Sequence, residues 1–161
     1  MDHGQTPKVP PVFDREMTFP AALDNLDRLL AWIETALEDY SCPVKTGIQI
    51  AMVAEEIFVN IADYAYPEKN GEVTVRTGRA GEAFAVQFED GGESFDPLDW
   101  PNPKTTGSIE ERKIGGLGIY LIKKMTDRVA YLRLNDKNLL TILKVPEEIQ
   151  PLVDPKNTDM P

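Results

Sequence analysis

Glu56 and Asn60 are the first residues of the chain whose types and spacing could do chemistry. They stand four apart within residues 53–66, where apolar residues such as Ile57 and Ile61 recur at helical spacing. On a helix they would lie one turn above each other on a single face, where a carboxylate and an amide can act on one bound object. A capped or solvated helix flank would explain the same pair, because motifs this short often match by accident.

Asp90 is a second candidate, because it precedes Gly91 and Gly92 at the end of an apolar stretch. An aspartate carboxylate accepts hydrogen bonds from an exocyclic amine, and glycine lets the backbone pass close to a ligand. A plain turn is the alternative explanation for this segment.

Residues 115–118 (Gly-Gly-Leu-Gly) precede a helical pattern and form a third candidate. Free backbone N–H groups at the positive end of a helix dipole suit a phosphate. The pattern is not a Rossmann fingerprint or a P-loop, because it lacks the strand–helix–strand frame and no Gly-Lys-Ser/Thr occurs. With Glu56 as a base, Asn60 as a hard oxygen ligand for Mg²⁺ and Asp90 as an amine acceptor, it indicates a nucleotide site.

Composition restricts the chemistry that the chain can perform. The 161 residues are 42% hydrophobic, which suits one domain, and 17 Lys plus Arg against 27 Asp plus Glu leave a net charge of -10 that disfavours nucleic acid and anionic membranes. Cys42 cannot form an internal disulfide, and His3 as the single histidine leaves zinc sites, catalytic triads and phosphohistidine relays poorly supplied. Without a long apolar run or a signal-peptide pattern, we expect a cytoplasmic protein.

Hydrophobic periodicity divides the chain into a flexible leader over residues 1–11, one domain over 12–145 and an acidic, proline-rich tail over 146–161. Residues 98–113 show no periodic pattern, so we expect a functional lid there. The order of strands and helices predicts an α+β fold, a two-layer sandwich with a mixed, mostly antiparallel sheet and helices on one face. Strands are expected over 12–19, 72–77, 83–89, 129–134 and 139–144, with a turn at 78–81, and helices over 20–39, 44–66 and from the glycines to about 126.

Three motifs follow one another in a fixed order: Glu56-x-x-x-Asn60, then Asp90-x-Gly92 with Phe95-Asp96-Pro97, then Gly116-Leu117-Gly118-Ile119 opening a helix. Together they resemble the N, G1 and G2 boxes of the GHKL ATPase superfamily, which has the Bergerat fold and includes gyrase, heat-shock chaperone ATPases, mismatch-repair ATPases and histidine kinases. The Ala65-Tyr66-Pro67 after the N box and the Gly-Gly-Leu-Gly-Ile form of the G2 box are most similar to anti-sigma-factor serine/threonine kinases.

The resemblance implies a role for each matching position. Asn60 would coordinate Mg²⁺ between the phosphates of ATP, Glu56 would be the base toward water or a serine hydroxyl, and Asp90 would bind the adenine amino group. The remaining nucleotide-binding positions would be Gly92, which gives the adenine room, Gly116 and Gly118, which hold the phosphates, Leu117 and Ile119 of the same motif, and Thr141 near the adenine. Tyr64 stands where the family often has a histidine.

The implied activity is transfer of the ATP γ-phosphate to a serine or threonine of an anti-anti-sigma antagonist, by a protein that sequesters a sigma factor. Lys104, Arg112 and Lys113 are charges in or beside the lid that would either touch the γ-phosphate or be solvated. A homodimer through the first strand and helix is possible, although core packing explains the same apolar residues. Two other functions fit the sequence: an ATP-binding switch module without phosphotransfer, and an interaction domain in which the glycines only make turns.

Overall fold

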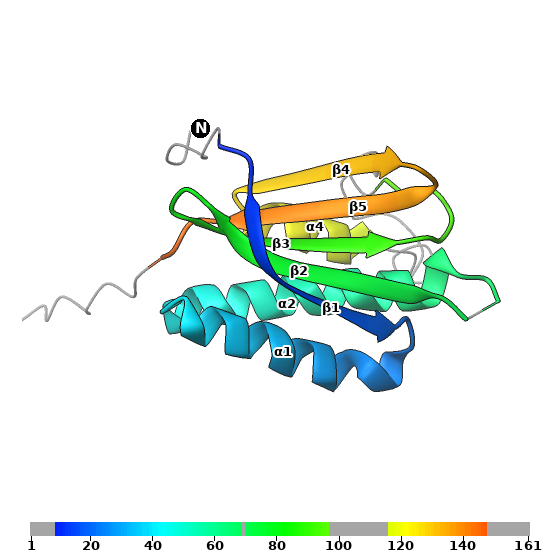
Figure 1. Ribbon diagram of the computed structural model, residues 1–161, viewed down its shortest axis with the longest axis horizontal. Helices are drawn as coiled ribbons and strands as arrows, with labels where there is room; N and C mark the ends of the chain where they lie inside the picture. Colours follow the sequence, from blue (N-terminus) through cyan, green and yellow to red (C-terminus); the bar gives the residue numbers. More distant parts are fainter. Residues whose placement is uncertain (1–8, 69, 97–115, 148–161) are drawn as a thin grey trace, which may run out of the picture.

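The computed structural model describes residues 9–68, 70–96 and 116–147, which form a sheet covered by helices on one face (Figure 1). The strands are β1 (Val12–Pro20), β2 (Glu72–Ala80), β3 (Ala83–Asp90), β4 (Arg128–Leu134) and β5 (Lys137–Lys144). Their order is β1-β2-β3-β5-β4, and every neighbouring pair is antiparallel. The expected α+β class and two-layer arrangement are confirmed, and the described sheet is wholly antiparallel rather than mixed.

The helical layer buries its apolar side against one face of the sheet. Its members are the 3₁₀ turn η1 (Leu23–Asn25), α1 (Leu26–Asp39), α2 (Val44–Asn60), the π-helical turn η2 (Ile61–Ala65) and α4 (Gly116–Met125). Figure 1 shows α2 and α4 behind the sheet and α1 beside α2, along the edge of the sheet that β1 forms. Large side chains from both layers are fully buried between them, among them Phe19, Leu29, Phe58, Phe88 and Ile122. This core fixes the ends of α2, α4 and β3 relative to one another.

The first helix begins at Leu26 rather than at Pro20 as the sequence predicts. Pro20 is still paired with Glu72 at the end of β1, and the next backbone N–H, that of Ala21, donates to the carbonyl oxygen of Gly71 over 2.9 Å. Because the sheet holds this stretch in extended conformation, helical hydrogen bonding starts only after it. The second predicted helix is confirmed, with its last turn widened into η2.

Both hairpins close with turns of two residues. Gly81, with φ of 60°, lies between Ala80 and Ala83, which pair across the hairpin. The β2–β3 turn is therefore residues 81–82, and residues 78–80 of the expected turn region 78–81 belong to β2. A positive φ at the first central residue is that of a type II′ turn. Asn135 and Asp136, with φ of 52° and 60°, form the type I′ turn between β4 and β5. The tight second turn starts β5 at Lys137, earlier than the predicted residue 139.

The ends of the chain and the lid fall largely beyond the part that the structure describes. The predicted lid at 98–113, residues 1–8 of the leader and residues 148–161 of the tail lie outside the described residues. At the described end, the backbone N–H of Glu147 donates to Oγ1 of Thr46 over 2.7 Å, which ties the chain after β5 to α2. No helix of the described residues has the length and apolar character needed to span a bilayer.

Candidate nucleotide site

A pocket opens where α2 and η2 pass the end of β3. Asn60 and Asp90, from motifs that are far apart in the sequence, both line it. Tyr64 lines the same pocket with 45% of its surface exposed, so the tyrosine that replaces the family's histidine belongs to the pocket wall. The other lining residues are mostly apolar: Ile57, Ile61, Ala65, Phe95, Ile122, Tyr131, Asn138 and Leu140. A largely apolar pocket with a few converging polar groups is the usual form of a small-molecule site.

Asp90 is the buried carboxylate of this pocket, with 6% of its surface exposed. Its Oδ1 accepts hydrogen bonds from the backbone N–H of Gly92 over 3.0 Å and from Nδ2 of Asn138 over 2.9 Å. Burial raises the pKa of Asp90 above its ordinary value, although these two hydrogen bonds and the nearby charge of Arg133 oppose the rise. A buried carboxylate that is held by neutral donors is suited to accept a hydrogen bond from a ligand.

Asn138 is a site residue outside the three sequence motifs. It pairs directly with Asp90 across β3 and β5 and is 3% exposed. Two residues of β4 donate to its side-chain oxygen: the hydroxyl of Tyr131 over 2.5 Å and Nη1 of Arg133 over 3.0 Å. Arg133 also donates to the carbonyl oxygen of Gly92 over 2.8 Å. The end of the sheet thus braces both Asp90 and the loop that follows it.

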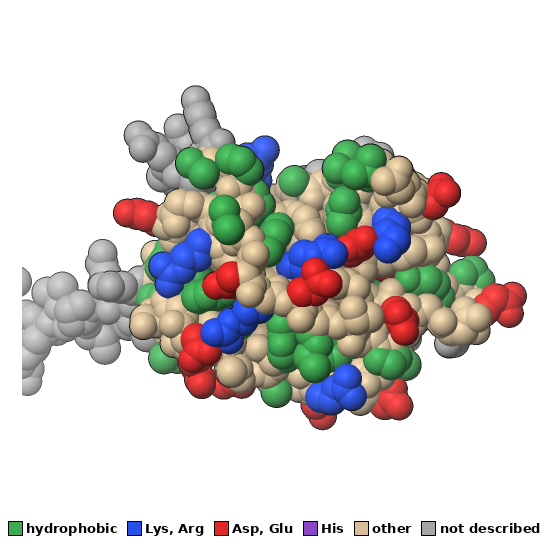
Figure 2. Space-filling view, viewed as in Figure 1, with side chains coloured by type: hydrophobic (Ala, Val, Ile, Leu, Met, Phe, Trp, Pro, Cys, Tyr) green, Lys and Arg blue, Asp and Glu red, His purple; other side chains and the backbone are tan. Residues whose placement is uncertain are grey.

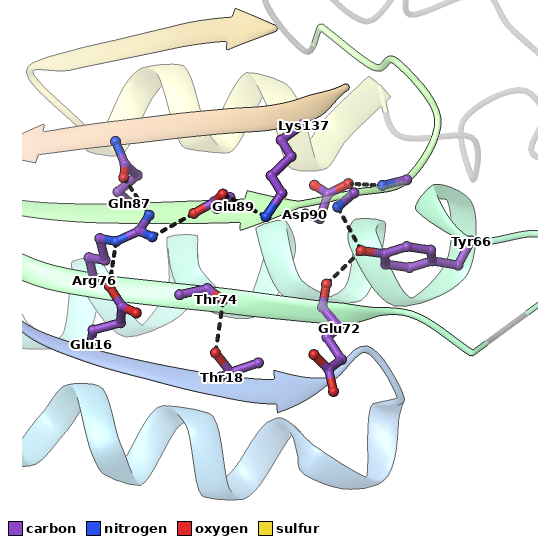
Figure 3. Close-up of polar contacts among 12 residues, drawn as sticks. Glu16, Thr18, Tyr66, Glu72, Thr74, Arg76, Gln87, Glu89, Asp90 and Lys137 are labelled. Carbon is purple, nitrogen blue, oxygen red and sulfur yellow. Dashed lines mark hydrogen bonds and ion pairs between the residues drawn. The ribbon is translucent and has the colours of Figure 1, made fainter. Parts of the chain in front are cut away.

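The loop after β3 is also docked on η2. The backbone N–H of Glu93 donates to the carbonyl oxygen of Ala65 over 2.8 Å, and that of Gly91 donates to the hydroxyl of Tyr66 over 2.7 Å. The same hydroxyl donates to the carbonyl oxygen of Glu72, so one phenol bridges β2 and this loop (Figure 3). A Cβ on Gly92 would lie 2.2 Å from the carbonyl oxygen of Ala65. Packing against η2 is therefore enough to require glycine at position 92, even before a ligand is considered.

Glu56 lies against the start of α4. A Cβ on Gly118 would come within 2.3 Å of its Oε2, so the carboxylate occupies the space that a side chain at position 118 would need. This contact brings the first and third motifs together. Gly116 and Leu117 are the first residues of α4, and Ile119 is buried with 3% exposure. Lys104, Arg112 and Lys113 lie outside the described residues.

Thr141 does not join this group. Side chains alternate along β5, so Asn138 and Leu140 face the pocket while Thr141 faces the opposite side of the sheet. There its Oγ1 accepts a hydrogen bond from Nε2 of Gln87 over 3.0 Å. The structure therefore gives no support for the predicted place of Thr141 beside the adenine, and Asn138 takes the position opposite Asp90 instead.

The face of the sheet that carries Thr141 is covered by surface charges rather than by helices. Arg76 on β2 contacts Glu16 over 2.8 Å and Glu89 over 2.6 Å, and Lys137 contacts Glu89 over 3.2 Å (Figure 3). Figure 2 shows acidic and basic side chains side by side near the middle of this face. Burial would raise the pKa of Glu89, but the bonds from Arg76 and Lys137 outweigh it and hold the pKa below its ordinary value.

The family is shown by a match over residues 19–144 to the model of the histidine kinase-like ATPase domain. The chain belongs to this family. It is 32% identical over 85 residues to the serine-protein kinase RsbW of Bacillus subtilis (strain 168), a match that covers 50% of this chain. The chain spans 53% of the length of that curated relative. The resemblance inferred from the three motifs is thereby confirmed.

Solved structures support the fold of this ATPase domain. The RsbU and RsbW domains of a Mycobacterium tuberculosis protein match with a TM-score of 0.58 and 12% identity, over 87% of this chain and 35% of that one. A blue-light activated histidine kinase of Erythrobacter litoralis matches with a TM-score of 0.51 and 21% identity, over 75% of this chain and 41% of that one. At these identities the likeness concerns the arrangement of the sheet and helices.

The residues present fit a nucleotide with Mg²⁺. Asn60 lines the pocket and carries an amide oxygen, and Mg²⁺ commonly takes one or two protein oxygens and completes its shell with phosphate and water oxygens. Within the described residues, no group of three or more His, Cys, Asp or Glu could hold a metal ion. Phosphate oxygens of a bound nucleotide would supply further ligands to the metal, as the family's use of ATP implies.

Proposed function

We propose that this ATPase domain is an anti-sigma serine/threonine kinase that transfers the γ-phosphate of ATP to a hydroxyl of an anti-anti-sigma antagonist and sequesters a sigma factor. One observation carries the proposal: Asn60 and Asp90 line one pocket, while Glu56 lies against Gly118 at the start of α4. These are the groups that adenine, metal and phosphates require, and they come from all three motifs. The similarity to the serine-protein kinase RsbW supports the kinase assignment.

In the proposed reaction the protein mainly positions and stabilises. Asp90 would accept a hydrogen bond from the adenine amine, and Asn60 would hold Mg²⁺, whose charge would offset that of the phosphates. The serine oxygen of the antagonist bonds to the γ-phosphorus as the bond to the β–γ bridging oxygen breaks, and ADP leaves. The hydroxyl proton passes to the carboxylate of Glu56. Phosphoryl transfer needs little else from a protein than alignment and charge stabilisation.

The first test is thermal unfolding with and without Mg²⁺ and ADP, on the wild type and on Asn60→Ala. Ligand at a hundred times its dissociation constant stabilises by about 2.7 kcal/mol. For a domain near this size, each kcal/mol raises the melting temperature by roughly 2–4 °C. We expect a Mg²⁺-dependent rise in the wild type that Asn60→Ala loses. An unchanged melting temperature at saturating ADP would favour the interaction domain without a nucleotide.

An ATP-binding switch without phosphotransfer is the second candidate, and Tyr64 is the observation that favours it. Its half-exposed ring stands in the pocket wall where relatives often carry a histidine. The two candidates differ in whether an antagonist gains phosphate. Incubation with γ-labelled ATP and the anti-anti-sigma type proteins of the source organism decides between them: label on a serine or threonine supports the kinase, and ADP binding without label supports the switch.

A further inference from the structure

Asn138 makes as many hydrogen bonds as its amide allows. Its Nδ2 donates to Oδ1 of Asp90 over 2.9 Å and to the carbonyl oxygen of Glu93 over 2.7 Å. Its Oδ1 accepts from the hydroxyl of Tyr131 and from Arg133. Arginine has only donors, so the oxygen of the amide must face Arg133 and the amino group must face Asp90. The orientation of this buried amide is therefore set by its neighbours.

This orientation limits what Asp90 can present to a ligand. Both hydrogen bonds that Asp90 accepts within the described residues, from Asn138 and from the N–H of Gly92, fall on Oδ1. Turning the carboxyl group would break both of them. Oδ2 of Asp90 is left as the acceptor for the pocket. A donor group of the ligand therefore meets an acceptor that cannot rotate away.

We propose that Asn138 is a positioning residue that locks the carboxylate of Asp90 and so makes the pocket select a 6-aminopurine over a 6-oxopurine nucleotide. This inference rests on the proposed nucleotide function. A 6-amino group donates to the locked acceptor, whereas a 6-oxo group would place two acceptors against each other. A site whose buried polar group is left unpaired by the wrong ligand discriminates strongly against that ligand.

Asn138→Asp tests the lock with a side chain of the same shape. The new carboxylate faces Asp90, and two carboxyl groups at hydrogen-bond distance share a proton. Arg133 and Tyr131 still donate to position 138, so they keep the charge there and leave the proton on Asp90. That proton lies between Oδ1 of Asp90 and position 138, so the fixed N–H donor that held the carboxylate of Asp90 is lost, and the preference of the pocket for a 6-amino group should weaken.

The experiment compares the affinities of ADP and inosine diphosphate, each with Mg²⁺, by titration calorimetry. In the wild type we expect ADP to bind at least about tenfold more tightly, the value of a hydrogen bond to a charged group. In Asn138→Asp this ratio should fall by about tenfold or more, chiefly because ADP binds less tightly. The matched control is Asn135→Asp, the same change in the exposed β4–β5 turn, which should keep the wild-type ratio.

Tyr131→Phe covers the case in which Asn138→Asp does not fold. It keeps the ring that lines the pocket and removes one donor to Asn138, so the ratio should fall by a smaller factor, roughly threefold to fivefold. A wild-type ratio in folded Asn138→Asp, or in Tyr131→Phe if the first variant is unfolded, overturns the inference. If the wild type binds neither nucleotide, the proposed function fails and the inference fails with it. Selective wild-type binding with no change in the variants defeats the inference alone.

Discussion

Glu89 and Asp90 are neighbours in the chain, but they lie on opposite faces of β3 and their environments differ. Glu89 faces the open side of the sheet, where Arg76 and Lys137 contact it directly and its pKa is lowered. Asp90 faces the helices, where neutral donors hold it and burial raises its pKa. A carboxylate that is neutralised by two cations has its partners within the protein, whereas a buried one without a cation in contact costs stability that a ligand can restore.

The largest expected effect is on the helical side of the sheet, at Glu56. Glu56→Gln should lower phosphotransfer by about 10²- to 10⁴-fold, because the amide cannot take the hydroxyl proton. ADP affinity should remain near that of the wild type, since Glu56 is assigned to bind neither the adenine ring nor the metal. The measurement is the initial rate of label transfer at saturating ATP, with ADP titration in parallel. Glu55→Gln, at an exposed position beside it, is the control. Equal loss of binding and transfer would contradict a role as base.

Asp90→Asn directly tests the difference between Asp90 and Glu89 on β3. It should weaken ADP binding by roughly 10- to 100-fold, the value of a hydrogen bond to a charged group. It should also make the apo protein more stable at neutral pH, because the raised pKa means that the stability from protonated Asp90 is lost as pH rises through its folded pKa.

The stability gain of Asp90→Asn should therefore shrink as the pH is lowered toward the ordinary aspartate pKa. Urea unfolding of both proteins at several pH values measures this dependence. Glu89→Gln is the matched control, and it should leave ADP binding unchanged. A variant that loses ADP binding and is also less stable at every pH would show that Asp90 is a structural residue.

Gly92→Ala tests whether the pocket side depends on close packing. The new methyl group would lie 2.2 Å from the carbonyl oxygen of Ala65, so the loop must move away from η2. We expect a loss of about 1–3 kcal/mol, as for other overpacked sites. At Gly91 an added Cβ would have Tyr66 Oη as its nearest neighbour at 3.8 Å, an ordinary contact. Gly91→Ala should therefore unfold near the wild-type temperature, and equal effects of both changes would contradict this account.

Glu89→Gln is the smallest expected effect, on the open side of the sheet. The lowered pKa means that the stabilising contribution is present above the unfolded pKa and is lost as pH falls through the folded one. At neutral pH we expect a loss of about 0.2–1 kcal/mol, the usual range for surface ion pairs. The loss should shrink in high salt and at acidic pH, as chemical denaturation can show. A larger loss that salt does not affect would mean that this network acts as a buried one.

The motifs predict the residues that line the pocket better than the residues that hold them in position. Asn60 and Asp90 were found because their spacing and glycine neighbours are local signals, and the structure places both in one pocket. Asn138 falls just before the strand that the sequence predicts over 139–144, whereas the type I′ turn at Asn135-Asp136 starts β5 earlier and brings Asn138 into it. The resemblance implies a place for Thr141 near the adenine, whereas the alternation of side chains along β5 puts it on the face opposite the pocket.

Other features needed the tertiary structure. Sequence periodicity predicts a continuous helix through residue 66, and the π-helical turn at its end shows no separate pattern. The extended stretch before α1 depends on pairing with β2, which joins residues that are far apart in the chain. Bonds of this kind cannot be found from one segment alone, because the partner that outweighs the local helical preference lies elsewhere.

The π-helical turn η2 has a consequence for the lengths that relatives of this chain can have. It places the carbonyl oxygen of Ala65 and the ring of Tyr66 where Glu93 and Gly91 reach them. Removing one residue between Asn60 and Tyr66 would shift everything after it around and along the helix axis. Both anchors of the loop would then point elsewhere. Gaps in this short interval should therefore be absent from functional relatives, even where the identities of its residues change.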